Sequence, residues 1–150
     1  MTIEHKGPFP ISIRDKIGNK IYGCDDCLSI CPWNKFAKPT ENKDLVPNED
    51  YKNLDFFLDF DKDKFEKYFC DSPVKRIGWI SFLRNVIIAS GNSNSTMFNT
   101  KLEKLLGHDN PIIRGASIWS LGKLSSKNKI KKLLKNEKNN YVLFELNSLS

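Results

Sequence analysis

The sequence predicts a mainly α-helical chain in which a short cysteine-bearing module precedes an array of paired helices. Three of the four cysteines fall within eight residues near the start of the chain. Apolar residues of the second half recur at steps of three and four, the spacing of one helix face. A six-residue motif also occurs twice in that half. We therefore expect a cysteine module at residues 1–40, an acidic linker with short helices at 41–70, and helical repeats at 71–150.

The repeated motif is the clearest long-range pattern. Asp71–Arg76 and Asp109–Arg114 share the form Asp-x-Pro-apolar-x-Arg at a separation of 38 residues, and each opens an apolar helical stretch. A second helix per unit is expected at Lys101–Leu106 and at Lys127–Lys135, with an incomplete one at Tyr141–Leu149. Two helices per unit of this length describe an α-solenoid of HEAT-like repeats.

Local chemistry explains the residues of this motif. The Asp side chain is expected to cap the helix, and the Pro suits the first helical turn. The most direct role for Arg76 and Arg114 is structural, as partners of a cap or of an acid on the neighbouring unit.

The segment before the repeats combines loops with short helices. A short helix is expected at Ile11–Ile17 and a polar linker between Thr40 and Asp50. Leu54–Phe69 predicts two short helices, the second capped by Asp61 or Asp63. The rings of this acidic segment are expected in the core, because its negative charge would repel the phosphates of a nucleic acid. These rings are Phe56, Phe57, Phe60, Phe65, Tyr68 and Phe69.

The net charge of +6 is concentrated in the second half of the chain. Residues 72–150 carry thirteen Lys and Arg against four Asp and Glu, whereas residues 41–71 carry five against ten. A segregated positive surplus favours a polyanionic partner, of which nucleic acid is the commonest. The alternative is that these cations line solvated helix faces without a partner.

Neither end of the sequence predicts a membrane protein. The first ten residues lack the apolar core of a signal peptide, and no apolar run reaches membrane-spanning length. We expect a soluble, cytoplasmic chain without a membrane partner, whose thiols stay reduced.

The cysteine run indicates iron–sulfur chemistry. Cys24, Cys27 and Cys31 follow the form Cys-x2-Cys-x3-Cys-Pro. The bacterial ferredoxin run has one more cysteine and ends in x3-Cys-Pro, and its last cysteine binds the other cluster of a pair. We interpret Cys24 and Cys27 as ligands of one [4Fe-4S] cluster and Cys31 as a ligand of a second, in part of a ferredoxin-like module.

The pattern disfavours zinc binding, thiol–disulfide exchange and chance as origins of the run. A zinc site needs a second Cys-x2-Cys or a His pair, and neither His5 nor His108 stands at ligand spacing. A thioredoxin-like site needs a β-α-β context that the sequence lacks. A chance cluster is disfavoured by the Cys-Pro pair at the correct end.

The number of thiols requires ligands from elsewhere. Two cubane clusters need eight thiolates, and the run supplies three. Cys70 follows Phe69 far downstream, and its aromatic neighbours predict a buried structural thiol. The five remaining ligands must then lie on sequence outside these 150 residues.

Several segments resemble the C-terminal part of epoxyqueuosine reductase, a family that completes queuosine synthesis in the anticodon of tRNA. The most specific are Gly23–Cys27 (Gly-Cys-Asp-Asp-Cys) and Cys31–Asn34 (Cys-Pro-Trp-Asn). Residues 2–8, 72–76 and 82–86 also match, and the similarity runs over essentially the whole chain.

The resemblance implies an oxidoreductase that converts epoxyqueuosine to queuosine in tRNA with cobalamin and two [4Fe-4S] clusters. The family combines an N-terminal cobalamin domain, a two-cubane ferredoxin-like module and a C-terminal HEAT-like domain. The cobalamin domain and the upstream cysteine run are not in these 150 residues. We therefore expect a monomer that is inactive alone, and a separate upstream polypeptide is one source of the missing parts.

The resemblance also assigns site residues. It implies that Cys24 and Asp25 lie against the cobalamin, that Lys6 reaches the same cofactor, and that His5 approaches the tRNA. No residue of this chain is assigned as catalytic.

The basic repeat region is expected to hold the tRNA backbone, because folded RNA is bound largely through phosphate and shape contacts. The first candidates are Lys75, Arg76 and Arg84, and a structural role is the alternative for each. A rival function of another class is a HEAT-like binding module whose cysteine loop is structural and holds a metal such as zinc.

Overall fold

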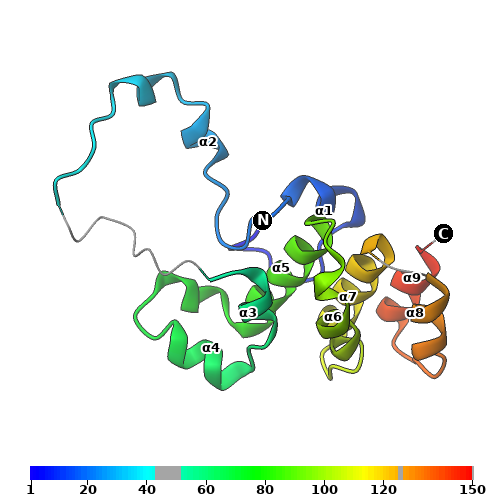
Figure 1. Ribbon diagram of the computed structural model, residues 1–150. Helices are drawn as coiled ribbons and strands as arrows, with labels where there is room; N and C mark the ends of the chain where they lie inside the picture. Colours follow the sequence, from blue (N-terminus) through cyan, green and yellow to red (C-terminus); the bar gives the residue numbers. More distant parts are fainter. Residues whose placement is uncertain (43–51, 125–126, 150) are drawn as a thin grey trace.

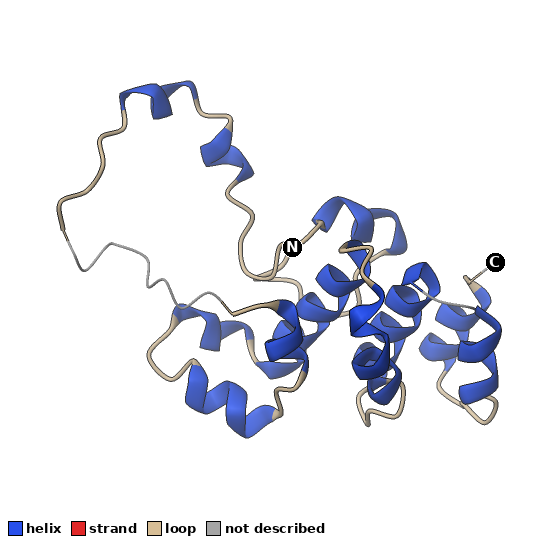
Figure 2. Cartoon of the chain, in the orientation of Figure 1, coloured by secondary structure: helices blue, strands red, loops and turns tan. Residues whose placement is uncertain are grey.

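The computed structural model describes residues 1–42, 52–124 and 127–149 as a set of short helices (Figure 1 and Figure 2). These residues contain no strand, which confirms the predicted mainly helical class, and none of their helices is long and apolar enough to cross a membrane. With 3-10 helices marked η, the elements are α1 (Ile11–Ile17), α2 (Asp26–Ser29), η1 (Pro32–Phe36), α3 (Leu54–Leu58), α4 (Lys62–Tyr68), η3 (Pro73–Ile77), α5 (Trp79–Asn92), η4 (Thr96–Phe98), α6 (Asn99–Leu105), α7 (Pro111–Leu124), α8 (Lys127–Leu133) and α9 (Asn140–Asn147).

The core lies between α5 and α7, and α7 also contacts α6, α8 and α9. The two helices approach closely at Gly91, where a Cβ would lie 2.8 Å from the Cα of Ser120. Ser120 Oγ donates a hydrogen bond to the carbonyl of Ile87 at 2.8 Å across the same crossing. Small residues here let the apolar faces meet, so that Leu83 and Ile118 are fully buried.

Both copies of the repeated motif begin helical segments, but their caps differ from the prediction. The first copy opens η3, which leads into α5, and the second opens α7. Ser72 Oγ accepts the amide N–H two residues further on at 3.3 Å, and Asn110 Oδ1 does the same at 2.9 Å. Asp71 and Asp109, the predicted caps, stand one residue too early, because the cap directly precedes the first helical residue. The HEAT-like assignment remains a prediction.

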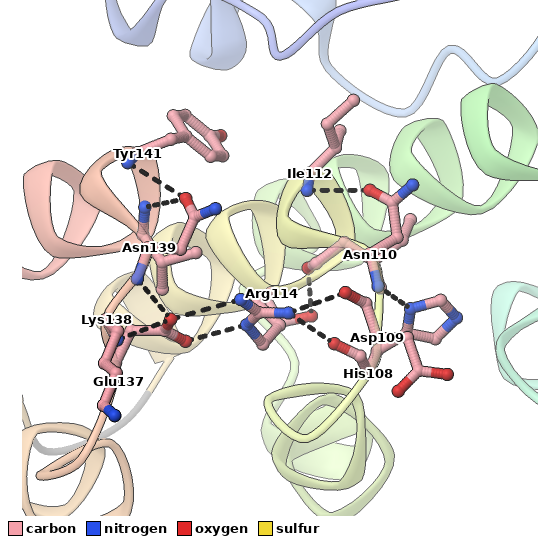
Figure 3. Close-up of polar contacts among 12 residues, drawn as sticks. His108, Asp109, Asn110, Ile112, Arg114, Glu137, Lys138, Asn139 and Tyr141 are labelled. Atoms are coloured by element: carbon pink, nitrogen blue, oxygen red, sulfur yellow. Dashed lines mark hydrogen bonds and ion pairs between the residues drawn. The ribbon is translucent and has the colours of Figure 1, made fainter.

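The two arginines of the motif have different environments. Arg114 donates from Nε to Glu137 at 2.8 Å and from Nη1 to two carbonyls that precede α7 (Figure 3). This hydrogen bond lowers the pKa of Glu137, which follows α8, so the pair joins α7 to the next helices. Arg76 is exposed instead and pairs with Glu4 at 3.1 Å. The predicted structural role, pairing with an acid on the neighbouring unit, is thus confirmed for Arg114.

The two short helices predicted in the aromatic segment are α3 and α4. Asp61 caps α4 by accepting the Lys64 N–H at 2.8 Å. Phe65 is fully enclosed, with its ring centroid 5.2 Å from that of Phe82 on α5. The predicted core role is confirmed for the buried rings of Phe60, Phe65 and Phe69, and it is wrong for Phe56 and Tyr68, which are exposed.

The helix predicted at Ile11–Ile17 is α1, and it is fastened to the other end of the chain. Arg14 and Glu145 of α9 are both 2 % exposed and form a two-point ion pair at 2.5 and 2.8 Å. Asn92 of α5 donates to the carbonyls of Arg14 and Gly18 at 2.8 and 2.9 Å. The opening segment of the chain therefore packs on the helical body.

The segment that carries the cysteine run leaves this body, and we call residues 24–42 the cysteine arm. In Figure 1 the arm forms an arc away from the other helices, with α2 on it. Its large apolar side chains are more than half exposed, namely Leu28, Ile30, Trp33 and Phe36. Most of the predicted linker, residues 43–50, lies outside the described residues.

Replacing Arg114 by Ala should lower the free energy of unfolding by about 2 to 3 kcal/mol, because the substitution leaves the largely buried Glu137 carboxylate without its partner. The matched control is Arg76→Ala, the same motif position in an exposed setting, which should change stability by less than about 0.5 kcal/mol. Urea unfolding followed by circular dichroism measures both values. Equal losses in the two variants would contradict the assigned difference.

Candidate functional site

The first two cysteines lie on either side of a tight turn. Gly23 and Asp25 have positive φ angles of 76° and 49°, so the backbone turns sharply around Cys24. The Asp25 carbonyl then accepts two amide N–H groups of α2, at 3.0 and 2.9 Å, and Cys27 lies in the first turn of that helix. The turn thus brings both cysteines to one end of the arm.

The thiols of the arm are accessible and free. Cys24 and Cys27 are exposed, and Cys31, which follows α2, is half-buried. Within residues 1–42, 52–124 and 127–149, no three His, Cys, Asp or Glu side chains lie together as a metal-binding group. The donor set therefore suits a thiolate-bound cluster whose remaining ligands come from outside the arm.

A chain of buried hydrogen bonds fixes the base of the arm. Thr2 Oγ1 accepts the Gly23 N–H at 3.0 Å and lies 3.2 Å from the Gly23 carbonyl, to which it donates. Asn85 of α5 is fully buried, and its Nδ2 donates to the carbonyls of Thr2 and Ile21 at 2.8 and 2.7 Å. We call Thr2, Gly23 and Asn85 the clasp, and it sets the backbone directly before Cys24.

Arg84 is buried beside the clasp and does not lie at the surface. Its side chain is 1 % exposed and donates to the carbonyls of His5 and Gly7, while its guanidinium lies 3.9 Å from the ring centroid of Phe9. Burial lowers the pKa of Arg84 to about 10, which leaves it charged at neutral pH. A side chain with every face covered has no room for a phosphate, so this placement corrects the expectation of a tRNA contact and favours the structural alternative.

The other residues assigned to cofactor and tRNA lie around the start of the chain and η3. His5 Nε2 lies 2.9 Å from the carbonyl of Pro8, and Lys6 Nζ donates to the Ile77 carbonyl at 3.0 Å. Lys75 and Arg76 of η3 are exposed and make surface ion pairs with Glu66 and Glu4. The Arg76 pair and the Lys6 hydrogen bond bring the first residues of the chain and η3 into one neighbourhood.

Cys70 is exposed, so the prediction of a buried thiol is wrong. Its Sγ lies 3.3 Å from Asp71 Oδ2. It follows the end of α4, where the neighbouring Phe69 ring turns into the core and the next side chain faces out.

Sequence reasoning did not find the clasp. Asn85 interrupts an otherwise apolar helix and is 0 % exposed, and such a polar residue within a predicted core face was the available sign. Thr2 gave none, because its partners lie far away along the chain.

Curated relatives of this chain share one description. Epoxyqueuosine reductases of Francisella cf. novicida and Pseudomonas aeruginosa are 40% and 36% identical to it over 82% and 81% of the chain. The chain spans about a third of the length of these relatives, 35% and 34%. No family model matches the chain.

Solved structures match over nearly the whole chain. Epoxyqueuosine reductase with an epoxyqueuosine-modified tRNA-Tyr stem loop matches with a TM-score of 0.87 at 27% identity, covering 97% of the chain and 40% of that protein. Epoxyqueuosine reductase from Bacillus subtilis matches with a TM-score of 0.82 at 28% identity, covering 97% of the chain and 41% of that protein. The resemblance predicted from the sequence is therefore confirmed.

Replacing Thr2 by Val should speed hydrogen exchange of the Gly23 amide by about tenfold or more, because the N–H loses its acceptor. Thr2→Ser keeps the hydroxyl and should retain the protection. Exchange followed residue by residue in NMR spectra measures this, with the core amides of α7 as the internal reference. Unchanged Gly23 exchange in the Val variant would contradict the clasp.

Proposed function

We propose that this chain, a homologue of epoxyqueuosine reductase over about a third of that enzyme's length, is the part that contributes cluster ligands and docks tRNA. The intact enzyme converts epoxyqueuosine to queuosine in tRNA. The observation that carries the proposal is the cysteine arm, three free thiols on an exposed loop fixed to a basic helical body. By itself the chain is inactive, because it supplies neither the cobalamin domain nor a full ligand set.

The arm contributes three thiolates to two [4Fe-4S] clusters in a ferredoxin-like module. Cys24 and Cys27 bind one cluster and Cys31 binds the other. The absence of a converging group of three metal-binding side chains among the described residues is compatible with this division. Five further thiolates come from polypeptide outside these 150 residues.

Exposed apolar side chains support a covering partner for the arm. Ile30 is 82% exposed and Trp33 is 74% exposed, with Leu28 and Phe36 also mostly in solvent. Four large apolar groups beside the thiols would leave water if the ligand-bearing polypeptide packed here. The same contact would enclose the clusters.

Cobalamin is the second cofactor, and Cys24, Asp25 and Lys6 are the residues of this chain that would approach it. A hollow of about 540 Å³ beside Cys24 is lined mainly by apolar side chains, including Ile3, Ile13 and Ile17. Iron–sulfur clusters supply single electrons, and cobalamin supplies the reductive chemistry at the epoxide. The chain itself fixes Cys24 through the clasp and shapes one wall of the site.

The tRNA with its modified anticodon base is the substrate, held by His5 and by Lys75 and Arg76 of η3. Both η3 cations make only exposed ion pairs, at 3.5 and 3.1 Å, which a phosphate replaces at little cost. Their carboxylate partners are side chains of the same chain, so tRNA binding would exchange one anion for another.

Anaerobic reconstitution with iron and sulfide should leave the isolated chain with fewer than the roughly eight irons of two cubanes, because most ligands are missing. Iron and sulfide analysis with absorbance spectra measures this. A full set of irons in the isolated chain would contradict the ligand count. Stoichiometric zinc without iron or sulfide would instead favour the rival, a HEAT-like binding module with a structural metal loop.

The double variant Lys75→Glu with Arg76→Glu should weaken binding of a tRNA anticodon stem-loop by about tenfold or more and should reduce the slope of log affinity against log salt by about 2. The matched control is Lys64→Glu with Lys67→Glu, the same charge change on α4. Fluorescence anisotropy over a salt series measures both. Binding that ignores salt, or equal losses in both variants, would count against a phosphate contact at η3.

A further inference from the structure

The start of α5 opens into a hollow that the proposed function does not use. Its volume is about 630 Å³. It lies between α4, the first turn of α5 and the loop before α7, and the residues that matter here are Lys62, Glu66, Gly78, Trp79, Ser81 and His108.

The first turn of α5 presents unpaired donors to this hollow. The helix begins at Trp79 after Gly78, which has a φ of 78° and no side chain to cap it. The amide N–H groups of Trp79, Ile80 and Ser81 have no acceptor among the described residues. Orphan N–H groups at the N-terminus of a helix, together with its dipole, attract anions.

Ser81 gives an independent indication of a ligand. It is 5 % exposed and lines the hollow, and its hydroxyl has no hydrogen-bond partner within the part of the chain that the structure describes. Buried hydroxyls normally have a partner, and the other buried serines of α5 and α7 have one. Ser90, Ser117 and Ser120 each donate to a backbone carbonyl at 2.8 to 2.9 Å.

The charges around the hollow favour an anionic ligand. Glu66 is paired with Lys75 at 3.5 Å, and Asp61 accepts the Lys64 N–H at 2.8 Å as the cap of α4. Both carboxylates therefore have partners of opposite polarity. Lys62 lines the same hollow without an ion pair among the described residues.

Two rings complete the lining. Trp79 and His108 have centroids 5.7 Å apart at an interplanar angle of 58°. His108 Nδ1 accepts the Asn110 N–H at 2.9 Å, so the neutral ring carries its hydrogen on Nε2 as a donor (Figure 3). Burial lowers the pKa of His108, which keeps the ring neutral at pH 7. An aromatic face beside anion donors suits a nucleotide.

We propose that the hollow at the start of α5 binds a phosphodiester of RNA, with the phosphate on the first-turn N–H groups and the Ser81 hydroxyl, the Lys62 ammonium nearby, and an adjoining base against Trp79. This inference rests on the proposed function for the identity of the RNA. Lys75 and Arg76 lie directly before α5, so the site extends the same RNA path.

The test is an NMR titration of the isotope-labelled chain in phosphate-free buffer, first with inorganic phosphate and then with a tRNA anticodon stem-loop. Both should shift the amides of Ile80 and Ser81 and the Trp79 indole with saturation. Ser81→Ala should weaken both by about 5- to 10-fold, because one hydrogen bond to a charged group is lost. Its control, Ser117→Ala, removes an equally buried hydroxyl on α7 and should leave both affinities unchanged.

A charge test stands beside it in case the serine variant unfolds. Lys62→Glu should weaken the α5 shifts, while Lys67→Glu on the same helix should not. Binding of phosphate without RNA shifts at α5, or no saturable shift with either probe, would overturn the site. RNA that binds elsewhere on the chain would overturn it while leaving the proposed function standing. Failure of cluster reconstitution with RNA shifts at α5 intact would uphold it and remove the reductase assignment.

Discussion

The structure depends on one buried polar connection, between α5 and the first residues of the chain. Arg84 and Asn85 sit in the middle of an apolar helix at 1 % and 0 % exposure, and both direct their donors largely to backbone carbonyls of residues 2–7 and 21. An unpaired buried guanidinium or amide would be costly, so these carbonyls must be present for α5 to pack. In return, α5 fixes the segment that leads to Cys24.

This connection divides the chain by function. On one side, the helical body is closed by the α5–α7 crossing and by the buried pair of Arg14 and Glu145. On the other, the cysteine arm keeps its thiols and apolar side chains in solvent. A rigid base under an uncovered arm is the form expected of a chain that completes a metal site together with other polypeptide.

Local features of the fold were predictable from the sequence. The bounds of α1, the two helices of the aromatic segment and the helices after each repeated motif follow from apolar spacing and turn residues. The caps were missed by one residue, because Asp71 and Ser72 are both good cap residues and only the helix start decides between them. Tertiary placement was not predictable, since the surface position of Cys70, the burial of Arg84 and the pairing of Thr2 with Gly23 depend on contacts between distant segments.

The central claim, that the arm divides its cysteines between two clusters, is tested most directly by electron paramagnetic resonance of the reduced protein. The sample is the chain joined with the polypeptide that supplies the other cysteines. Cys27→Ser and Cys31→Ser should each disturb a different cluster, so the two variants should retain different cluster spectra. Loss of the same spectrum in both variants would place the three cysteines on one cluster and contradict the division.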